Sequence, residues 1–219
     1  MRARAVALAL ALLGLTAPAA QAETWSARDA RGDAETLVYS PDPPPCGTST
    51  LSPAPTARRQ DLTALRVDHG SQAVVIRLRM ADVARRDHST SWSVHLLTPD
   101  RGYLLVVFPR RPGEAVDAFL SEEPEVPANP DPADCTVGSL VIGRGGCDGL
   151  SVHLDAAADR LDLTVPRRCL GRPRWVRVGA DVSGAFTGSA ETGYSVTGDT
   201  WSPGAATAYP IYGPRVHAG

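Results

Sequence analysis

The sequence contains no lysine, and all 22 of its lysine-type or arginine-type basic residues are arginine. Asn129 is its only asparagine. Alanine is abundant, and there are 20 glycines and 19 prolines. This bias is typical of a high-GC genome, such as that of an actinobacterium, so the many arginines do not by themselves indicate a function. The formal net charge of −2 argues against nucleic acid, or any other polyanion bound through overall charge, as a partner.

Only one long apolar run is present, at residues 5–15, and it is shorter than the roughly 20 residues that cross a bilayer. Two arginines precede it, and residues 20–22 (Ala-Gln-Ala) follow it with the small-x-small pattern of a cleavage site. This tripartite pattern predicts a secretory signal peptide over residues 1–22 and a mature chain over 23–219. No cysteine closely follows the apolar run, which argues against a lipoprotein anchor. We therefore expect a secreted, extracellular protein with no membrane anchor after cleavage.

No catalytic or metal-binding motif is present. The nucleophile elbow Gly-x-Ser-x-Gly is absent, and no two histidines have the His-x-His or His-x-x-x-His spacing of a metal site. We expect all five histidines to lie in solvent: His69, His88, His95, His153 and His217. The sequence thus predicts no metal, no cofactor and, on balance, no enzyme. A hydrolase whose active-site residues are scattered along the chain is the alternative.

Period-two alternation of apolar and polar residues is the clearest structural signal. It covers residues 65–68, 74–80, 92–96, 150–154 and 161–165. Residues 103–108 are apolar on both faces, as in a central strand. No segment shows helical spacing beyond one or two turns. About nine short strands predict an all-β fold, a single antiparallel β-sandwich of the jelly-roll or immunoglobulin-like kind.

Two proline-rich stretches predict long connections, at residues 41–55 and near 110–134, and residues 118–120 of the second are a candidate short strand. The second is also acidic and contains Glu122, Glu123 and Glu125. The carboxylate pair of a glycosidase is held by rigid elements at a defined separation. A solvated loop is therefore the better interpretation of these glutamates.

Four cysteines in an exported chain predict two disulfides. Cys147 and Cys169 lie eleven residues on either side of position 158, near the centre of the turn expected at residues 155–159. A hairpin folded there brings these two cysteines opposite each other, within disulfide distance. Cys46 and Cys135 then remain as the second pair. The alternative pairing, Cys135–Cys147, closes only a small Gly-rich loop.

Arginine and tryptophan residues near Cys169 suggest a binding surface. The basic cluster consists of Arg167, Arg168, Arg172, Arg174 and Arg177. Guanidinium groups can hold an anionic wall polymer or a carboxylated glycan through bidentate contacts. Trp92 alternates onto the core face, which leaves two tryptophans for stacking on a sugar. The candidate binding residues are Trp175, Trp201, Arg174 and Arg177, with core packing and an ordinary charged surface as the alternatives.

Three segments carry a resemblance to known proteins: residues 29–33 (Asp-Ala-Arg-Gly-Asp), 61–83 and 165–171. Together they resemble a group of small secreted actinobacterial proteins without an assigned biochemical role. The first segment and the hairpin after it are also similar to the openings of DOMON-like domains and family-nine carbohydrate-binding modules, which are β-sandwiches. Haem-binding DOMON domains use Met and His as axial ligands. Here Met80 is expected on the core face and His95 on the face opposite to that of Trp92, so no haem site is implied.

The sequence therefore predicts a non-catalytic extracellular binding or structural module, which we expect to be a monomer. Its ligand is expected to be a glycan, a wall polymer or a protein.

Overall fold

A computed structural model describes residues 22–42, 47–83, 89–108, 116–123, 147–202 and 211–219. Within this part of the chain the only helices are two short 3-10 turns, η1 (Arg58–Gln60) and η2 (Arg167–Leu170), beside fourteen strands. Among these residues no helix has the length and apolar character of a membrane span. The prediction of an all-β, antiparallel sandwich is confirmed, with more strands than the nine expected.

The smaller sheet has five antiparallel strands in the order β1-β4-β5-β10-β9. Its strands are β1 (Glu23–Arg28), β4 (Leu62–His69), β5 (Ala73–Met80), β10 (Arg160–Pro166) and β9 (Ser151–Asp155). The hairpin of β4 and β5 and the hairpin of β9 and β10 are the two that alternation predicted. The pairing of β1 with β4, and of β5 with β10, joins segments that are far apart in the chain.

The larger sheet has nine strands, and its main path runs β3-β2-β13-β11-β6-β7-β8. Its strands are β2 (Glu35–Ser40), β3 (Thr48–Pro53), β6 (Ser91–Leu97), β7 (Gly102–Phe108), β8 (Asp117–Glu122), β11 (Trp175–Ser183) and β13 (Gly193–Thr200). Two shorter strands lie off this path: β12 (Thr187–Ser189) pairs with β13, and β14 (Val216–His217) pairs with β11.

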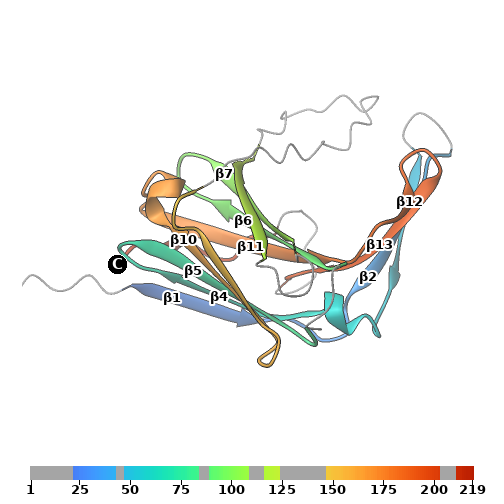
Figure 1. Cartoon of the computed structure of the whole chain (residues 1–219), viewed down its shortest axis with the longest axis horizontal. Coiled ribbons are helices and arrows are strands. Elements are labelled where there is room, and N and C mark those ends of the chain that lie inside the picture. Colours follow the sequence, from blue (N-terminus) through green and yellow to red (C-terminus); the bar gives the residue numbers. More distant parts are fainter. Residues whose placement is uncertain (1–21, 43–46, 84–88, 109–115, 124–146, 203–210) are drawn as a thin grey trace, which may run out of the picture.

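The two sheets pack face to face (Figure 1). The apolar residues of the alternating strands form one core cluster between them. Leu65 and Val67 of β4 are fully buried, and so are Val94 and Leu96 of β6 on the other sheet. Trp92 is also in this core, as its alternation predicted. The strands of the smaller sheet therefore keep their polar residues on an outward face.

One end of the larger sheet, formed by β2, β3, β12 and part of β13, extends beyond the smaller sheet (Figure 1). Residues 41–55 were expected to be a loop, and this is wrong for β3, all of whose residues are exposed. Alternation marks a strand when one face is buried and the other is in water. A strand that is exposed on both faces has no such constraint, so β3 carries no alternating signal.

The disulfide predicted at the base of the second hairpin is confirmed. In the β9–β10 ladder Asp155 is the partner of Arg160, so the turn lies where the cysteine positions placed it. Cys147 and Cys169 are joined, with their Cα atoms 5.9 Å apart. Cys46 and Cys135 lie outside the described residues, so their pairing stays a prediction.

The chain enters the sandwich at Glu23, the residue that follows the expected cleavage point. Glu23 is the partner of His69 in the β1–β4 ladder, and its carboxylate accepts a hydrogen bond from the backbone N–H of His217. Residues 1–21 lie outside the described residues, so the signal peptide and export stay predictions.

Candidate functional site

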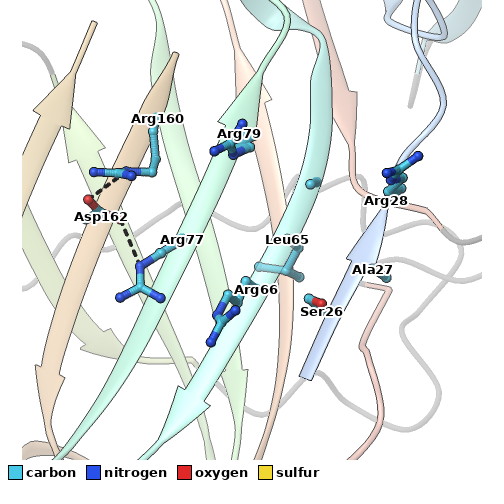
Figure 2. Close-up of a pocket in the computed structure, with 10 residues that line it drawn as sticks. Ser26, Ala27, Arg28, Leu65, Arg66, Arg77, Arg79, Arg160 and Asp162 are labelled. Carbon is cyan, nitrogen blue, oxygen red and sulfur yellow. Dashed lines mark ion pairs between the residues drawn. The ribbon is translucent and has the colours of Figure 1, made fainter. Parts of the chain in front are cut away.

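The outward face of the smaller sheet gathers five arginines, which we call the arginine face: Arg28, Arg66, Arg77, Arg79 and Arg160 (Figure 2). The strand register arranges them in two rows. In the first row Arg28 faces Ala64, Ala64 faces Arg79, and Arg79 faces Arg160. In the second row Ser26 faces Arg66, Arg66 faces Arg77, and Arg77 faces Asp162. The arginines come from four strands whose order the sequence does not reveal.

A hollow of about 710 Å³ lies on this face, and its lining contains all five arginines but a single acidic residue, Asp162. Ala64 stands between Arg28 and Arg79 in the first row and has no long side chain. Neighbouring strands are about 4.8 Å apart, so Arg28 and Arg79 emerge roughly 10 Å from each other on either side of that gap. The floor of the hollow is a rigid sheet, which holds the positions of the side-chain bases.

Carboxylates neutralise three of these arginines. Asp68 accepts hydrogen bonds from Arg66 (3.0 Å) and Arg77 (2.8 Å). Asp162 forms ion pairs with Arg160 (2.8 Å) and Arg77 (3.3 Å). Partial burial favours the neutral form of Asp68, but hydrogen bonds from Arg66 and Thr24 outweigh it and hold its pKa below the ordinary value. Asp68 is therefore a stable anchor for its two arginines.

Arg28 and Arg79 differ from the other three. Both are exposed, and neither guanidinium group forms an ion pair or hydrogen bond with any described residue. An unpaired guanidinium presents five N–H donors in a planar fork that fits a phosphate or a carboxylate. These two side chains are thus the ones free to hold an anion.

The four candidate binding residues lie in two places. Trp201 and Arg177 share the lining of a second hollow, of about 510 Å³, with Trp25 and Tyr212, whereas Trp175 and Arg174 are not part of that lining. Trp201 is only 1% exposed and packs edge-on against Trp25. The guanidinium of Arg177 donates hydrogen bonds to the backbone carbonyls of Gly213 and Tyr212.

Trp175 is 8% exposed, and Arg215 lies over its ring, 4.6 Å from the centroid. Arg174 is exposed. Little ring surface of Trp175 or Trp201 is left for a sugar, and Arg177 already bonds within the protein. Ligand binding by these four residues stays a prediction, and their contacts favour the packing alternative for three of them.

A second set of aromatic residues lies on the part of the larger sheet that extends beyond the sandwich. Tyr39 and Tyr194 face each other across β2 and β13 and stack with their ring centroids 5.0 Å apart. Phe186, which is 66% exposed, meets Tyr194 edge-on at 5.6 Å. These rings were not predicted from the sequence, because only the fold shows that no core covers them.

The expectation that the histidines lie in solvent is wrong for His69 and His95, which are 0% and 6% exposed. His69 continues the buried side of β4, and its Nδ1 lies 2.8 Å from the carbonyl oxygen of Val216. This contact makes Nδ1 the donor, and burial lowers the pKa of His69. His153 and His217 are exposed, as expected, and His88 lies outside the described residues.

His95 lies between two carboxylates on the outward face of the larger sheet. Its Nδ1 is 2.5 Å from Glu123 Oε1, and its Nε2 is 3.0 Å from Asp181 Oδ2. Burial alone favours the neutral ring, but the hydrogen bonds to Asp181 and Glu123 prevail and raise the pKa of His95 to about 9. A ring that is protonated at neutral pH cannot serve as a general base. His95 is therefore not suited to be the general base of a hydrolase, and the hydrolase alternative stays a prediction.

One group of described residues has the donor atoms for a metal. Asp33, Asp61 and Asp199 each place a carboxylate oxygen within 4.8 Å of the others. The sequence predicted no metal site, and it does not reveal this cluster, because the three aspartates come from distant segments. The motif at residues 29–33 was the one signal, and it identifies only Asp33.

Comparison with protein-family models, with curated proteins and with solved structures found no match.

Proposed function

We propose that this chain is a non-catalytic extracellular binding module, and that its arginine face holds an anionic polymer of the cell envelope. The polymer carries phosphate or carboxylate groups at intervals. The observation that carries this proposal is the first row of the face, where two exposed guanidinium groups flank a shallow hollow and have no carboxylate partner among the described residues.

Charge complementarity is the physical reason for choosing an anionic ligand. The formal net charge of the whole chain is −2, so attraction by overall charge is weak. On the arginine face, however, the hollow is lined by five arginines and one aspartate. Binding would therefore be local, and it would weaken as salt screens the contacts.

The ion pairs give the face two kinds of arginine with different roles. Arg66 and Arg77 are held by Asp68, so they fix the shape of the hollow and repel other cations. Arg28 and Arg79 have no such partner in the described part of the chain and would make the direct contacts. A hydrogen bond to a charged group contributes about 1.5–3 kcal/mol, so the loss of two would weaken binding by at least tenfold.

The test is calorimetric titration of the mature protein with three soluble polymers: a poly(glycerol phosphate), polygalacturonate and dextran. The first two separate phosphate from carboxylate as the bound group, and dextran is the neutral reference. We expect binding of at least one anionic polymer and none of dextran. The double variant Arg28→Gln/Arg79→Gln should lose at least tenfold in affinity.

Arg172→Gln/Arg174→Gln is the matched control, because both side chains are exposed, the charge change is the same, and both lie outside the two rows. It should bind as the unmodified protein does. If the control loses affinity and the first variant does not, the site is the basic cluster around Cys169. Absence of binding to both anionic polymers would overturn the proposal.

The exposed ring of Phe186 and the half-buried rings of Tyr39 and Tyr194 favour a second candidate, in which the module binds a neutral glycan by stacking. Dextran and a soluble β-glucan are suitable probes. Phe186→Ala should abolish binding of either glycan in the same titration, and Arg28→Gln/Arg79→Gln should leave that binding intact. Glycan binding that is unaffected by Phe186→Ala would exclude this candidate.

A further inference from the structure

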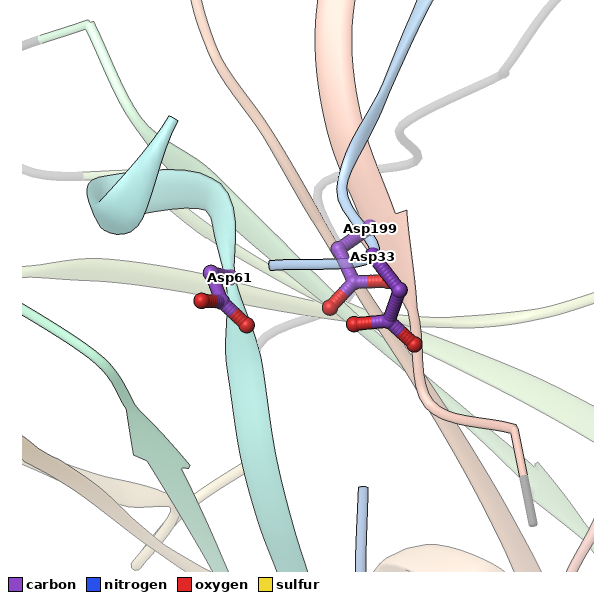
Figure 3. A group of neighbouring side chains, drawn as sticks. All are labelled: Asp33, Asp61 and Asp199. Atoms are coloured by element: carbon purple, nitrogen blue, oxygen red, sulfur yellow. The ribbon is translucent and has the colours of Figure 1, made fainter. Parts of the chain in front are cut away.

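Three aspartates from separate parts of the chain converge where the two sheets meet (Figure 3). Asp33 lies in the connection from β1 to β2, Asp61 immediately precedes β4, and Asp199 is near the end of β13. In Figure 3 the carboxylate of Asp61 reaches toward those of Asp33 and Asp199. Since β1 and β4 belong to the smaller sheet, and β2 and β13 to the larger, the cluster joins both halves of the sandwich.

One carboxylate oxygen of Asp61 is buried and lacks a hydrogen-bond partner among the described residues. Its side chain is 3% exposed, and Oδ2 accepts a hydrogen bond from the backbone N–H of Gly32 at 3.0 Å. Its other oxygen, Oδ1, is shielded from solvent and has no hydrogen-bond partner among the described residues. A buried carboxylate oxygen without a partner is costly. The position of Oδ1 therefore points to a group that none of the described residues supplies.

The three carboxylates carry negative charge that no nearby ion pair neutralises among the described residues. No described arginine or histidine forms an ion pair with Asp33, Asp61 or Asp199. Asp199 accepts a hydrogen bond from the backbone N–H of Leu62 at 2.8 Å. One carboxylate oxygen of each aspartate lies within 4.8 Å of the others, and negative charges at this separation repel one another. A cation bound between the carboxylates would remove this repulsion.

We propose that Asp33, Asp61 and Asp199 bind one Ca²⁺ ion that links the two sheets. Oxygen atoms within 4.8 Å of one another can all lie at the roughly 2.3–2.6 Å coordination distance of Ca²⁺. An all-carboxylate donor set selects a hard cation and disfavours Zn²⁺ and Cu²⁺, which prefer nitrogen and sulfur. Three carboxylates with waters completing the shell suit the flexible coordination of Ca²⁺ better than the strict octahedron of Mg²⁺.

This site would act on stability rather than on ligand contact. An ion that binds only the folded state stabilises it in proportion to the logarithm of its concentration over Kd. Extracellular Ca²⁺ modules have Kd values of about 0.1–1 mM. At 10 mM Ca²⁺ and a Kd of about 0.1 mM, the thermal midpoint should rise by about 5–10 °C.

The experiment measures the thermal midpoint and calorimetric binding of the mature protein, first stripped with EDTA and then supplied with CaCl₂ or MgCl₂. We expect Ca²⁺ to bind with one-to-one stoichiometry and to raise the midpoint, with Mg²⁺ at least tenfold weaker. Asp33 is exposed, so Asp33→Asn should fold normally and lose at least tenfold in Ca²⁺ affinity. Asp61→Asn and Asp199→Asn should lose it as well.

Asp100→Asn is the matched control, because it removes one exposed carboxylate in the turn between β6 and β7. It should keep the full response to Ca²⁺, and so should Arg28→Gln/Arg79→Gln, which separates this site from polymer binding. No effect of Ca²⁺ up to 10 mM on the unmodified protein would overturn the proposal. Equal binding of Mg²⁺, or Ca²⁺ binding that Asp33→Asn leaves unchanged, would overturn it too.

Discussion

Arg79 lies directly opposite Arg160 across the β5–β10 ladder, and of the two only Arg160 forms ion pairs with described carboxylates, those of Asp155 and Asp162. Like charges at directly opposed positions destabilise a sheet. Stability alone would favour a residue without positive charge at one of these two positions, or an aspartate beside Arg79. The pair is therefore consistent with a face whose positive charge serves binding.

The first prediction concerns the cost of this pair. Arg79→Gln removes the repulsion from Arg160, so the free energy of unfolding should rise by about 0.2–1 kcal/mol. Urea denaturation at low and high salt measures the change, and salt should reduce it. Arg66→Gln is the control, because Arg66 pairs with Asp68, and its loss should give no gain. Equal destabilisation by both variants would show that Arg79 is not under repulsion.

The second prediction concerns pH. The pKa of His95 is raised from 6.5 to about 9, so its protonation stabilises the folded state. This stabilisation is complete below about pH 6.5 and is lost as the pH rises through about 9. A shift of this size corresponds to about 3 kcal/mol. Urea denaturation between pH 6 and pH 10 should show the loss.

In His95→Gln this pH-dependent loss should be absent, and the variant should be less stable at pH 6, because Glu123 and Asp181 lose the charge between them. His153→Gln, at an exposed histidine, should keep the profile of the unmodified protein. If His95→Gln also keeps that profile, His95 is not the titrating group.

The third prediction concerns Gly179, which faces His95 across the β6–β11 ladder. A Cβ atom at position 179 would lie 2.2 Å from the backbone oxygen of Ile211, and real Cβ atoms do not approach so closely. Gly179→Ala should therefore displace the segment at residues 211–213 and cost more than about 2 kcal/mol. Hydrogen exchange should show faster exchange at Gly213, whose N–H bonds to Val178. Gly171→Ala is a useful contrast, because nothing lies within 4 Å of its Cβ position. Any loss of folding free energy in Gly171→Ala should come only from the positive φ of position 171.

The fourth prediction concerns the disulfides. Removing the Cys147–Cys169 bridge with the double change to serine should cost about 3 kcal/mol, because the bridge closes a loop of 22 residues. Denaturation with urea measures this loss, with the reduced unmodified protein as the comparison. Peptide mapping without reduction should also yield a Cys46–Cys135 fragment. A fragment joining Cys135 to Cys147 would contradict both pairs.

Alternation in the sequence was sufficient for part of the fold. The hairpin of β4 and β5 was predictable because one face is buried and the other wet, so the apolar residues recur every second position. The mirrored positions of Cys147 and Cys169 about one turn were sufficient for the disulfide. These features are local, since each depends on residues close together in the chain.

The candidate sites depend on contacts between distant segments, which only the tertiary structure decides. The arginine face exists because β1 pairs with β4 and β5 with β10, and no pattern in Arg28, Arg79 or Arg160 indicates that order. The aspartate cluster needs Asp33, Asp61 and Asp199 to meet at the junction of two sheets. By its alternation His95 is expected to face solvent, but Glu123 and Asp181 bond to its ring, and Tyr212 in turn donates a hydrogen bond to Glu123. Period and spacing thus determined which segments are strands and which way they face. Packing of remote strands determined which charges are paired, which are buried and which remain free.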